Sequence, residues 1–274
     1  MTSSSYLKKI RFSISKKINT AFIGQYRSAF RGNGLLFDAI REYQPGDDVK
    51  NIDWKVSARM RNLFVKQYQE ERELNIVIMI DMSGSMDFGS TRTKKDVLME
   101  FTALLLFLAE YTNDRVSVLL FTDEVEWFFR AKRCRRYVLK VLNDIIHFKP
   151  KNKKTGINEA LDFLSKVTRK RSVVFMISDF IDNAYDTQLK RVVRKHDFIP
   201  VSVSDPQESS LSFFGLASFY DLETDKVIYA TETSYNDVNL KQYGVEPLKL
   251  STDSSVEHDV LEYFKKRNKK RLHG

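Results

Sequence analysis

The chain has 274 residues, 42% of them apolar, which is enough for one large folded domain with an appendage. Its single cysteine, Cys134, excludes an internal disulfide framework and a cysteine-based zinc cage. The four histidines stand far apart, which argues against a histidine-rich metal site. No apolar run reaches the roughly 18–20 residues of a membrane helix, and the N-terminus lacks the pattern of a signal peptide. These features predict a cytoplasmic protein with reduced thiol chemistry.

The net charge of +9 is spread unevenly along the chain. Residues 1–37 carry seven basic residues and no acid, residues 130–154 carry ten against Asp144 alone, and residues 265–274 carry six. Residues 205–260 show the opposite balance, with eleven acids and three bases. A basic surface could serve nucleic acid, anionic lipid or an acidic protein, or it could be an ordinary solvated face. The basic runs lack interleaved aromatics, so nucleic-acid binding is an alternative that depends on charge alone.

The first third of the chain shows few regular patterns. A basic amphipathic helix is predicted within residues 6–30, and Gly32-Asn33-Gly34 reads as a turn. Pro45 and Gly46 occupy the two central positions of a type II turn. Residues 62–69 are predicted to be extended.

From residue 75 onward, apolar strands alternate with helices. Strands are predicted at residues 75–80, 116–121, 125–129, 172–177, 198–203, 218–222 and 227–231. Helices are predicted at residues 94–111, 133–147, 158–168, 185–196 and 255–270. This alternation predicts an α/β fold with a doubly wound, mostly parallel sheet flanked by helices. We expect residues 74–274 to form this domain, with residues 1–73 as a basic N-terminal extension packed on it.

Several oxygen-bearing side chains follow the predicted strands. Asp81, Ser83 and Ser85 come after the strand at 75–80, Asp179 follows the strand at 172–177, and Thr155 precedes a helix. In doubly wound sheets, ligands bind at the carboxyl ends of the strands, so these residues can converge at one edge. Hard oxygen donors suit Mg²⁺ or Mn²⁺ and do not suit zinc. Because few of the donors are charged, the ion would keep positive charge and an open position for an acidic group.

The Asp-x-Ser-x-Ser pattern has a simpler explanation, in which the Asp caps a helix and the hydroxyls stabilise a turn. The order of the pieces along the chain, however, resembles the metal-ion-dependent adhesion site of von Willebrand factor type A domains. That resemblance implies that one Mg²⁺ (or Mn²⁺) is held by five residues. They are Asp81, Ser83, Ser85, Thr155 and Asp179.

Three stretches in the first third, at residues 34–38, 41–49 and 52–59, resemble the defining segment of the domain-of-unknown-function family 58. In that family this segment directly precedes a von Willebrand factor A-like domain. The resemblance spans roughly residues 30–270 and implies a MoxR-type AAA+ ATPase as partner, in chaperone-like assembly or metal insertion. Many members begin with two membrane helices, a pattern not seen here, so any membrane association is expected to run through partners.

Two hypotheses apply to the stretch from Arg41 to Arg59. In the favoured one, Trp54 and Tyr43 are core anchors, and a buried lattice of ion pairs fixes the segment on the α/β domain. The residues expected in that lattice are Arg41, Asp47, Asp53 and Arg59. In the alternative, the stretch is a second binding site.

Two enzyme classes fit the sequence less well. A haloacid dehalogenase-like phosphotransferase needs a second Asp two residues after the nucleophile, where this chain has Ser83. A serine hydrolase needs a Gly-x-Ser-x-Gly elbow and a histidine base, and neither is present at Ser83 or Ser85. We therefore expect a non-enzymatic protein-binding module without a small-molecule substrate. A Glu or Asp of the partner would complete the coordination of the metal.

Overall fold

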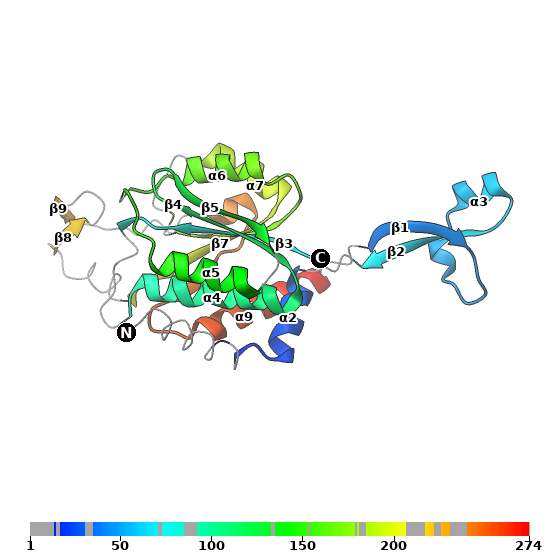
Figure 1. Cartoon of the computed structure of the whole chain (residues 1–274), viewed down its shortest axis with the longest axis horizontal. Helices are drawn as coiled ribbons and strands as arrows, with labels where there is room; N and C mark the ends of the chain where they lie inside the picture. Colours follow the sequence, from blue (N-terminus) through cyan, green and yellow to red (C-terminus); the bar gives the residue numbers. More distant parts are fainter. Residues whose placement is uncertain are drawn as a thin grey trace.

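The computed structural model describes residues 14, 17–30, 35–70, 73–84, 92–132, 135–152, 154–178, 180, 185–206, 217–221, 226–230 and 240–273 (Figure 1). At its centre lies a six-stranded sheet with the order β10-β7-β6-β3-β4-β5. Its strands are β3 (Asn75–Asp81), β4 (Arg115–Phe121), β5 (Val125–Lys132), β6 (Val173–Ile177), β7 (Asp197–Ser204) and β10 (Leu248–Ser251). Neighbouring strands are parallel except for β5, which is antiparallel to β4. The predicted doubly wound, mostly parallel sheet is confirmed.

The two faces of the sheet explain the continuous apolar run of β3. Ile76, Ile78 and Ile80 join one core cluster, whereas Val77 and Met79 join the other. A strand that is covered on both sides has no solvent face, so it needs no alternation of polar residues. The helices on the first side are α2 (Thr20–Phe30), α4 (Lys94–Thr112), α5 (Arg135–Ile146) and α9 (Val256–His273). Those on the second side are α6 (Ile157–Val167) and α7 (Asp186–Lys195) (Figure 1).

Helix α2 belongs to the core of the α/β body, although many residues separate it from β3, the first strand of the six-stranded sheet. Its Phe22, Tyr26 and Phe30 lie with their ring centroids 5.8, 5.9 and 5.2 Å from the ring of Phe264 on α9. Two α9 arginines, Arg267 and Arg271, donate hydrogen bonds to the Ala29 carbonyl at 3.1 and 2.9 Å. Basic groups that bind the last carbonyls of a helix stabilise its C-terminal end. The division at residue 73 stays a prediction, but α2 packs with the domain that follows it.

The buried carboxylate of Asp114 joins two segments that the sequence separates. It accepts hydrogen bonds from the Tyr26 hydroxyl and the Leu74 backbone N–H, both at 2.9 Å, and from the Thr112 hydroxyl. Tyr26 lies before residues 31–73 and Leu74 lies directly after them. Asp114 therefore fixes the points at which the chain leaves the body and returns to it.

Between these points, residues 35–70 form a small separate unit, which we call the arm. Strand β1 (Leu35–Glu42) pairs antiparallel with β2 (Phe64–Glu70), and η1 (Val49–Asn51) and α3 (Trp54–Met60) lie between them in the chain. Figure 1 shows the arm standing apart from the α/β body. The predicted turn is present, since the Asp47 N–H donates to the Gln44 carbonyl at 3.0 Å and Gly46 has a φ of 107°.

The expectation that this stretch packs onto the α/β domain is wrong for the arm. Trp54 is 65% exposed, because α3 turns Val56 and Ser57 inward and Trp54 outward. The expected buried lattice of ion pairs is also absent from the described arm. The two terminal nitrogens of Arg41 donate to the two carboxylate oxygens of Asp47 at 2.8 and 2.6 Å. Asp53 is the N-cap of α3, and its carboxylate accepts the Lys55 and Val56 N–H groups. Arg59 is exposed. These charged side chains stabilise a turn and a helix N-cap within the arm, so they need no contact with the α/β domain.

Two smaller elements complete the described chain. Strand β8 (Ala217–Asp221) pairs antiparallel with β9 (Lys226–Ala230), within one residue of the predicted strands. The short helix η3 (Leu240–Tyr243) leads into β10. Among the residues that the structure describes, no helix combines the length and the apolar character needed to cross a bilayer.

Candidate metal site at the carboxyl edge of the sheet

The centre of the sheet is also the point where the strand order reverses. From β3 the chain moves to β4 on one side, and it later returns to β6 on the other side of β3. The carboxyl ends of β3 and β6 flank this switch point, which is where ligands bind in open α/β sheets. Asp81 is the last residue of β3, and Ser178 directly follows β6. Topology thus brings their side chains to the same edge.

The Asp81 carboxylate is the centre of a cluster of hydroxyl groups. It is fully buried, and its Oδ1 accepts the Ser83 backbone N–H at 3.0 Å. Its Oδ2 accepts the Ser178 hydroxyl at 2.7 Å and the Thr155 hydroxyl at 3.4 Å. The structure therefore brings together three of the five predicted residues, Asp81, Ser83 and Thr155. It also holds the carboxylate in one orientation.

A close backbone approach positions Thr155. The next residue, Gly156, donates its N–H to the Thr122 carbonyl at 2.8 Å and is the N-cap of α6. A Cβ on Gly156 would lie 2.6 Å from the Asp123 carbonyl oxygen, so only glycine fits. This contact joins the loop after β4 to the start of α6. It places Thr155 beside Asp81.

The other two predicted residues, Ser85 and Asp179, lie outside the described residues. Of the neighbours of Asp179, Ser178 accepts the Phe180 N–H at 3.2 Å, and Phe180 is buried with a φ of 56°. A non-glycine residue in the left-handed region is uncommon and is found where the surroundings fix the backbone. The backbone at Phe180 is thus locally constrained by its contact with Ser178, which binds Asp81.

Ser178 is a member of the cluster that sequence reasoning missed. Its hydroxyl donates a hydrogen bond to Asp81 at 2.7 Å, yet it lies 97 positions away in the chain. The signal was available, because Ser178 is the first polar residue after a fully apolar strand.

The described donors fit a hard divalent cation better than a soft one. They are a carboxylate and hydroxyl oxygens, with no sulfur or imidazole among them, which suits Mg²⁺ or Mn²⁺. The described residues contain no group of three or more His, Cys, Asp or Glu side chains able to hold a metal ion. Asp81 is therefore the carboxylate around which a site at this edge would form.

The sheet order, its antiparallel edge strand and the helices on both faces define an α/β fold of the von Willebrand factor A-like class. An aerotolerance-related membrane protein from Bacteroides fragilis, solved with multiple mutations to serines, has a similar fold. The two structures align with a TM-score of 0.51 at 13% sequence identity, and the alignment covers 72% of this chain and 99% of that one. BatB from Bacteroides thetaiotaomicron aligns with a TM-score of 0.49 at 14% identity, over the same shares of the two chains.

The sequence profile described as "Protein of unknown function DUF58" matches residues 39–241, which is more than half of the chain. The chain belongs to this family. An uncharacterized protein of Mycobacterium tuberculosis, Rv1480, is 25% identical over 287 aligned positions, covering 98% of this chain and 90% of that protein. The uncharacterized protein YeaD of Bacillus subtilis is 38% identical over 50 residues, or 18% of this chain and 13% of that protein.

Proposed function

We propose that the chain is a non-enzymatic protein-binding module that recognises an acidic side chain of its partner through a divalent cation. Asp81, Ser83, Ser85, Thr155 and Asp179 would hold a Mg²⁺ or Mn²⁺ ion. The observation that carries this proposal is the convergence of Thr155 and Ser178 hydroxyls on the buried Asp81 carboxylate at the switch point. Buried hydroxyl groups that converge on one carboxylate either satisfy that carboxylate or serve a ligand.

The charge of the donors determines what the site could bind. Ser83, Ser85 and Thr155 are neutral, so the two aspartates at most cancel the charge of a divalent ion. The bound ion would supply a position that a carboxylate of the partner can occupy. The basic segments of the chain would attract an acidic surface over a longer range and raise its association rate.

The partner that the family resemblance favours is a MoxR-type AAA+ ATPase, acting with this chain in assembly or maturation of client proteins. This part of the proposal depends on the resemblance, and the chemistry of the site requires only that the partner present a Glu or an Asp. Nucleic acid is the alternative ligand, favoured by the net charge of +9.

Metal binding can be tested by thermal unfolding. We expect saturating Mg²⁺ to raise the melting temperature by several degrees, because a ligand at 100 times its Kd stabilises the folded state by about 2.7 kcal/mol. Asp81→Asn should abolish the rise. The control is Asp205→Asn, which removes another buried carboxylate just after β7, where the Thr252 hydroxyl donates to it at 2.7 Å. A wild-type melting curve that is unchanged by millimolar Mg²⁺ and Mn²⁺ would refute the metal site.

Partner binding needs a separate capture experiment. A MoxR-type ATPase from the same cell should be retained by the immobilised wild-type chain with Mg²⁺ and released by EDTA. Asp81→Asn should fail to retain it, and Asp205→Asn should retain it as the wild type does. Retention that persists in EDTA would contradict the metal bridge. Salt-sensitive binding of arbitrary DNA that ignores Asp81→Asn would favour the nucleic-acid alternative.

A further inference from the structure

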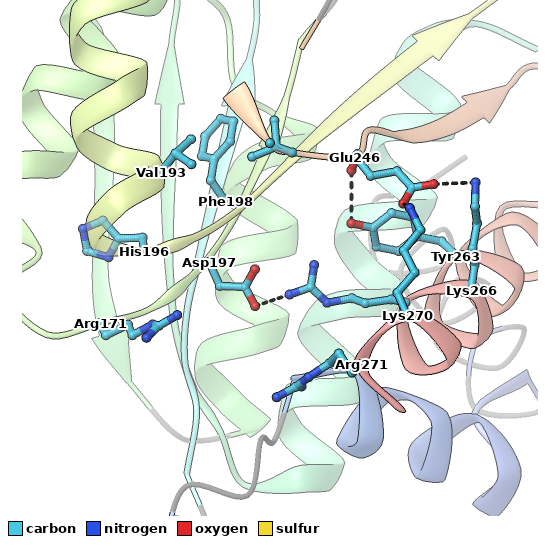
Figure 2. Close-up of a pocket in the computed structure, with 13 residues that line it drawn as sticks. Arg171, Val193, His196, Asp197, Phe198, Glu246, Tyr263, Lys266, Lys270 and Arg271 are labelled. Carbon is cyan, nitrogen blue, oxygen red and sulfur yellow. Dashed lines mark hydrogen bonds and ion pairs between the residues drawn. The ribbon is translucent and has the colours of Figure 1, made fainter. Parts of the chain in front are cut away.

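A second candidate site lies at the opposite edge of the sheet. Parallel strands place all their amino ends together, and the first residue of β7, Asp197, lines a cavity of about 690 Å³ at that edge (Figure 2). Helix α7, the loop before β10 and helix α9 supply most of its other walls. The volume falls within the range of pockets that bind small molecules. Asp81 is at the carboxyl edge, so the two sites are distinct.

Cationic side chains dominate the lining of this cavity. Five basic residues line it: Arg171, Lys266, Arg267, Lys270 and Arg271. Only two acidic residues do so, Asp197 and Glu246. Fully ionised, the lining carries three more positive than negative charges. This excess favours an anionic ligand over a neutral one or a cation.

Both carboxylates are already satisfied by neighbouring cations. Arg267 forms an ion pair with Asp197, and Lys266 and Lys270 both pair with Glu246. Burial acts to raise the pKa of Glu246, but the hydrogen bonds from the two lysines outweigh it and hold that pKa below its usual value. Two ammonium groups share one carboxylate, so the three groups together carry a net positive charge that can attract a ligand.

Two arginines approach the cavity from different elements. Arg171 precedes β6, is exposed, and forms no hydrogen bond or ion pair with any residue that the structure describes. Arg271 of α9 donates to the Ala29 carbonyl through one terminal nitrogen, Nη1, so other donors of its guanidinium remain for a ligand. In Figure 2 the two side chains extend toward the cavity from opposite sides. Guanidinium groups match the oxygens of a phosphoryl group with paired hydrogen bonds.

A buried histidine forms part of the cavity wall. His196, the C-cap of α7, lines the cavity and is 3% exposed, and neither ring nitrogen has a hydrogen-bond partner in the described structure. Unpartnered buried polar groups are rare and costly, because they lose their hydrogen bonds to water. Both ring nitrogens are also shielded from solvent, so His196 shapes the wall of the cavity and does not face its interior.

The remaining lining is apolar, with Val193, Phe198 and Val245 beside the charged groups. We propose that the cavity binds a small phosphorylated organic molecule. Arg171, Arg271 and the lysine pair hold its phosphoryl group, and the apolar side chains contact its organic part. The volume of about 690 Å³ suits a small molecule better than a nucleic-acid duplex or a protein surface. This inference does not depend on the metal site.

Calorimetric titration of the full chain with pyrophosphate and with ATP tests the proposal, in EDTA so that no divalent ion contributes. We expect saturable binding of one molecule per chain, with ATP the tighter ligand because it adds an organic part. Arg171→Glu should weaken binding by at least about tenfold, the effect of losing one charge-assisted hydrogen bond. The matched control is Lys140→Glu, which makes the same charge change at an exposed lysine on α5, outside the cavity.

A second variant guards against loss of folding. Lys270→Ala leaves Lys266 to pair with Glu246 and should also weaken binding, while the circular dichroism spectrum and melting temperature stay close to those of the wild type. Absence of saturable binding to the wild type would overturn the proposal. Equal weakening by Arg171→Glu and Lys140→Glu would do so too, since it would show general charge attraction. Binding of poly-glutamate without binding of pyrophosphate or ATP would instead assign the cavity to an acidic protein segment.

Discussion

Burial determines what Asp81 can do. A carboxylate shielded from water by Ser83, Thr155 and Ser178 interacts more strongly with a cation than an exposed one, because the local dielectric is low. The same burial requires that the carboxylate be satisfied when no ion is bound, and the hydroxyl groups of Thr155 and Ser178 do this. A hydroxyl can donate to Asp81 and can also offer its oxygen to a metal. A serine or threonine is therefore suited to both situations.

His196 should make the stability of the protein depend on pH. Burial, followed by the charges of Lys195 and Arg171, lowers its pKa from 6.5 to about 4. Since the unfolded state takes up a proton near pH 6.5 and the folded state only near pH 4, stability falls as the pH drops through this interval. The expected loss is on the order of 3 kcal/mol when the pH reaches about 4.

Urea unfolding of the wild type and of His196→Phe across this pH interval measures that loss. The variant has no titrating group at this position, so the difference in unfolding free energy between the two proteins isolates the histidine from the carboxylates. We expect the wild type to lose stability relative to the variant as the pH falls. Parallel curves for the two proteins would show that His196 is not buried in its neutral form.

At the scale of single residues, the sequence predicted Asp81, Ser83 and Thr155 because each stands at the edge of a strongly patterned element. Ser178 also stands at such an edge, directly after β6, but its contact with Asp81 does not follow from that position alone. Its role arises from the pairing of β3 with β6, which no local pattern records. The unpartnered state of His196 is likewise a property of the packing around it and has no sequence signature.

Among the elements, α2 packs its aromatic side chains in the core, whereas the aromatic side chain of α3 does not. Trp54 on α3 is exposed, whereas Phe264 of α9 is fully buried against the aromatic rings of α2. We therefore expect Trp54→Ala to change the unfolding free energy by about 0.5 kcal/mol or less. Phe264→Ala should cost roughly 3–5 kcal/mol.

Thermal melts of the two variants provide the measurement, and Phe264→Leu serves as a milder change if Phe264→Ala fails to fold. A drop of more than about five degrees for Trp54→Ala would mean that the tryptophan packs onto another surface in solution. In that case the original expectation of a core anchor would be restored. An unchanged melt for Phe264→Leu and Phe264→Ala would contradict the contact between α2 and α9.

The elements that the sequence predicted best are those whose burial is uniform. The apolar run of β3 and the Leu-rich α4 are covered on most sides, so composition alone identifies them. Strand β1 was missed because residues 35–42 show neither alternation nor a continuous apolar run. Helix α3 has seven residues and β10 has four, which is too short for a periodic pattern to appear.

For the whole molecule, the separation of the arm from the body leads to a prediction about deletions. A chain in which residues 35–70 are replaced by a short Gly/Ser linker should keep a cooperative melt within a few degrees of the wild type. Removal of residues 1–30 should instead lower the melting temperature strongly or cause aggregation, because it exposes Phe175 and Phe264 where Phe30 packs.

Circular dichroism melts and size-exclusion chromatography of both shortened chains test this prediction. The chain without the arm should elute as a folded species of the corresponding smaller size. Loss of its cooperative unfolding would show that the arm contributes to the core. A stable, soluble chain without residues 1–30 would show that α2 is dispensable.

The contact of Tyr26 and Leu74 with Asp114 has a mechanical consequence. A partner that pulled on the arm would place tension on the chain on both sides of it, and the same carboxylate holds the chain on both sides. Asp114 is itself tied to Thr112 at the end of α4, and Arg115 beside it donates its N–H to the Leu74 carbonyl at 2.9 Å. The contacts at the amino edge of the sheet would therefore bear the force, and β3 would not. The arm could act as a tether under load while the geometry around Asp81, at the far end of that strand, stayed unchanged.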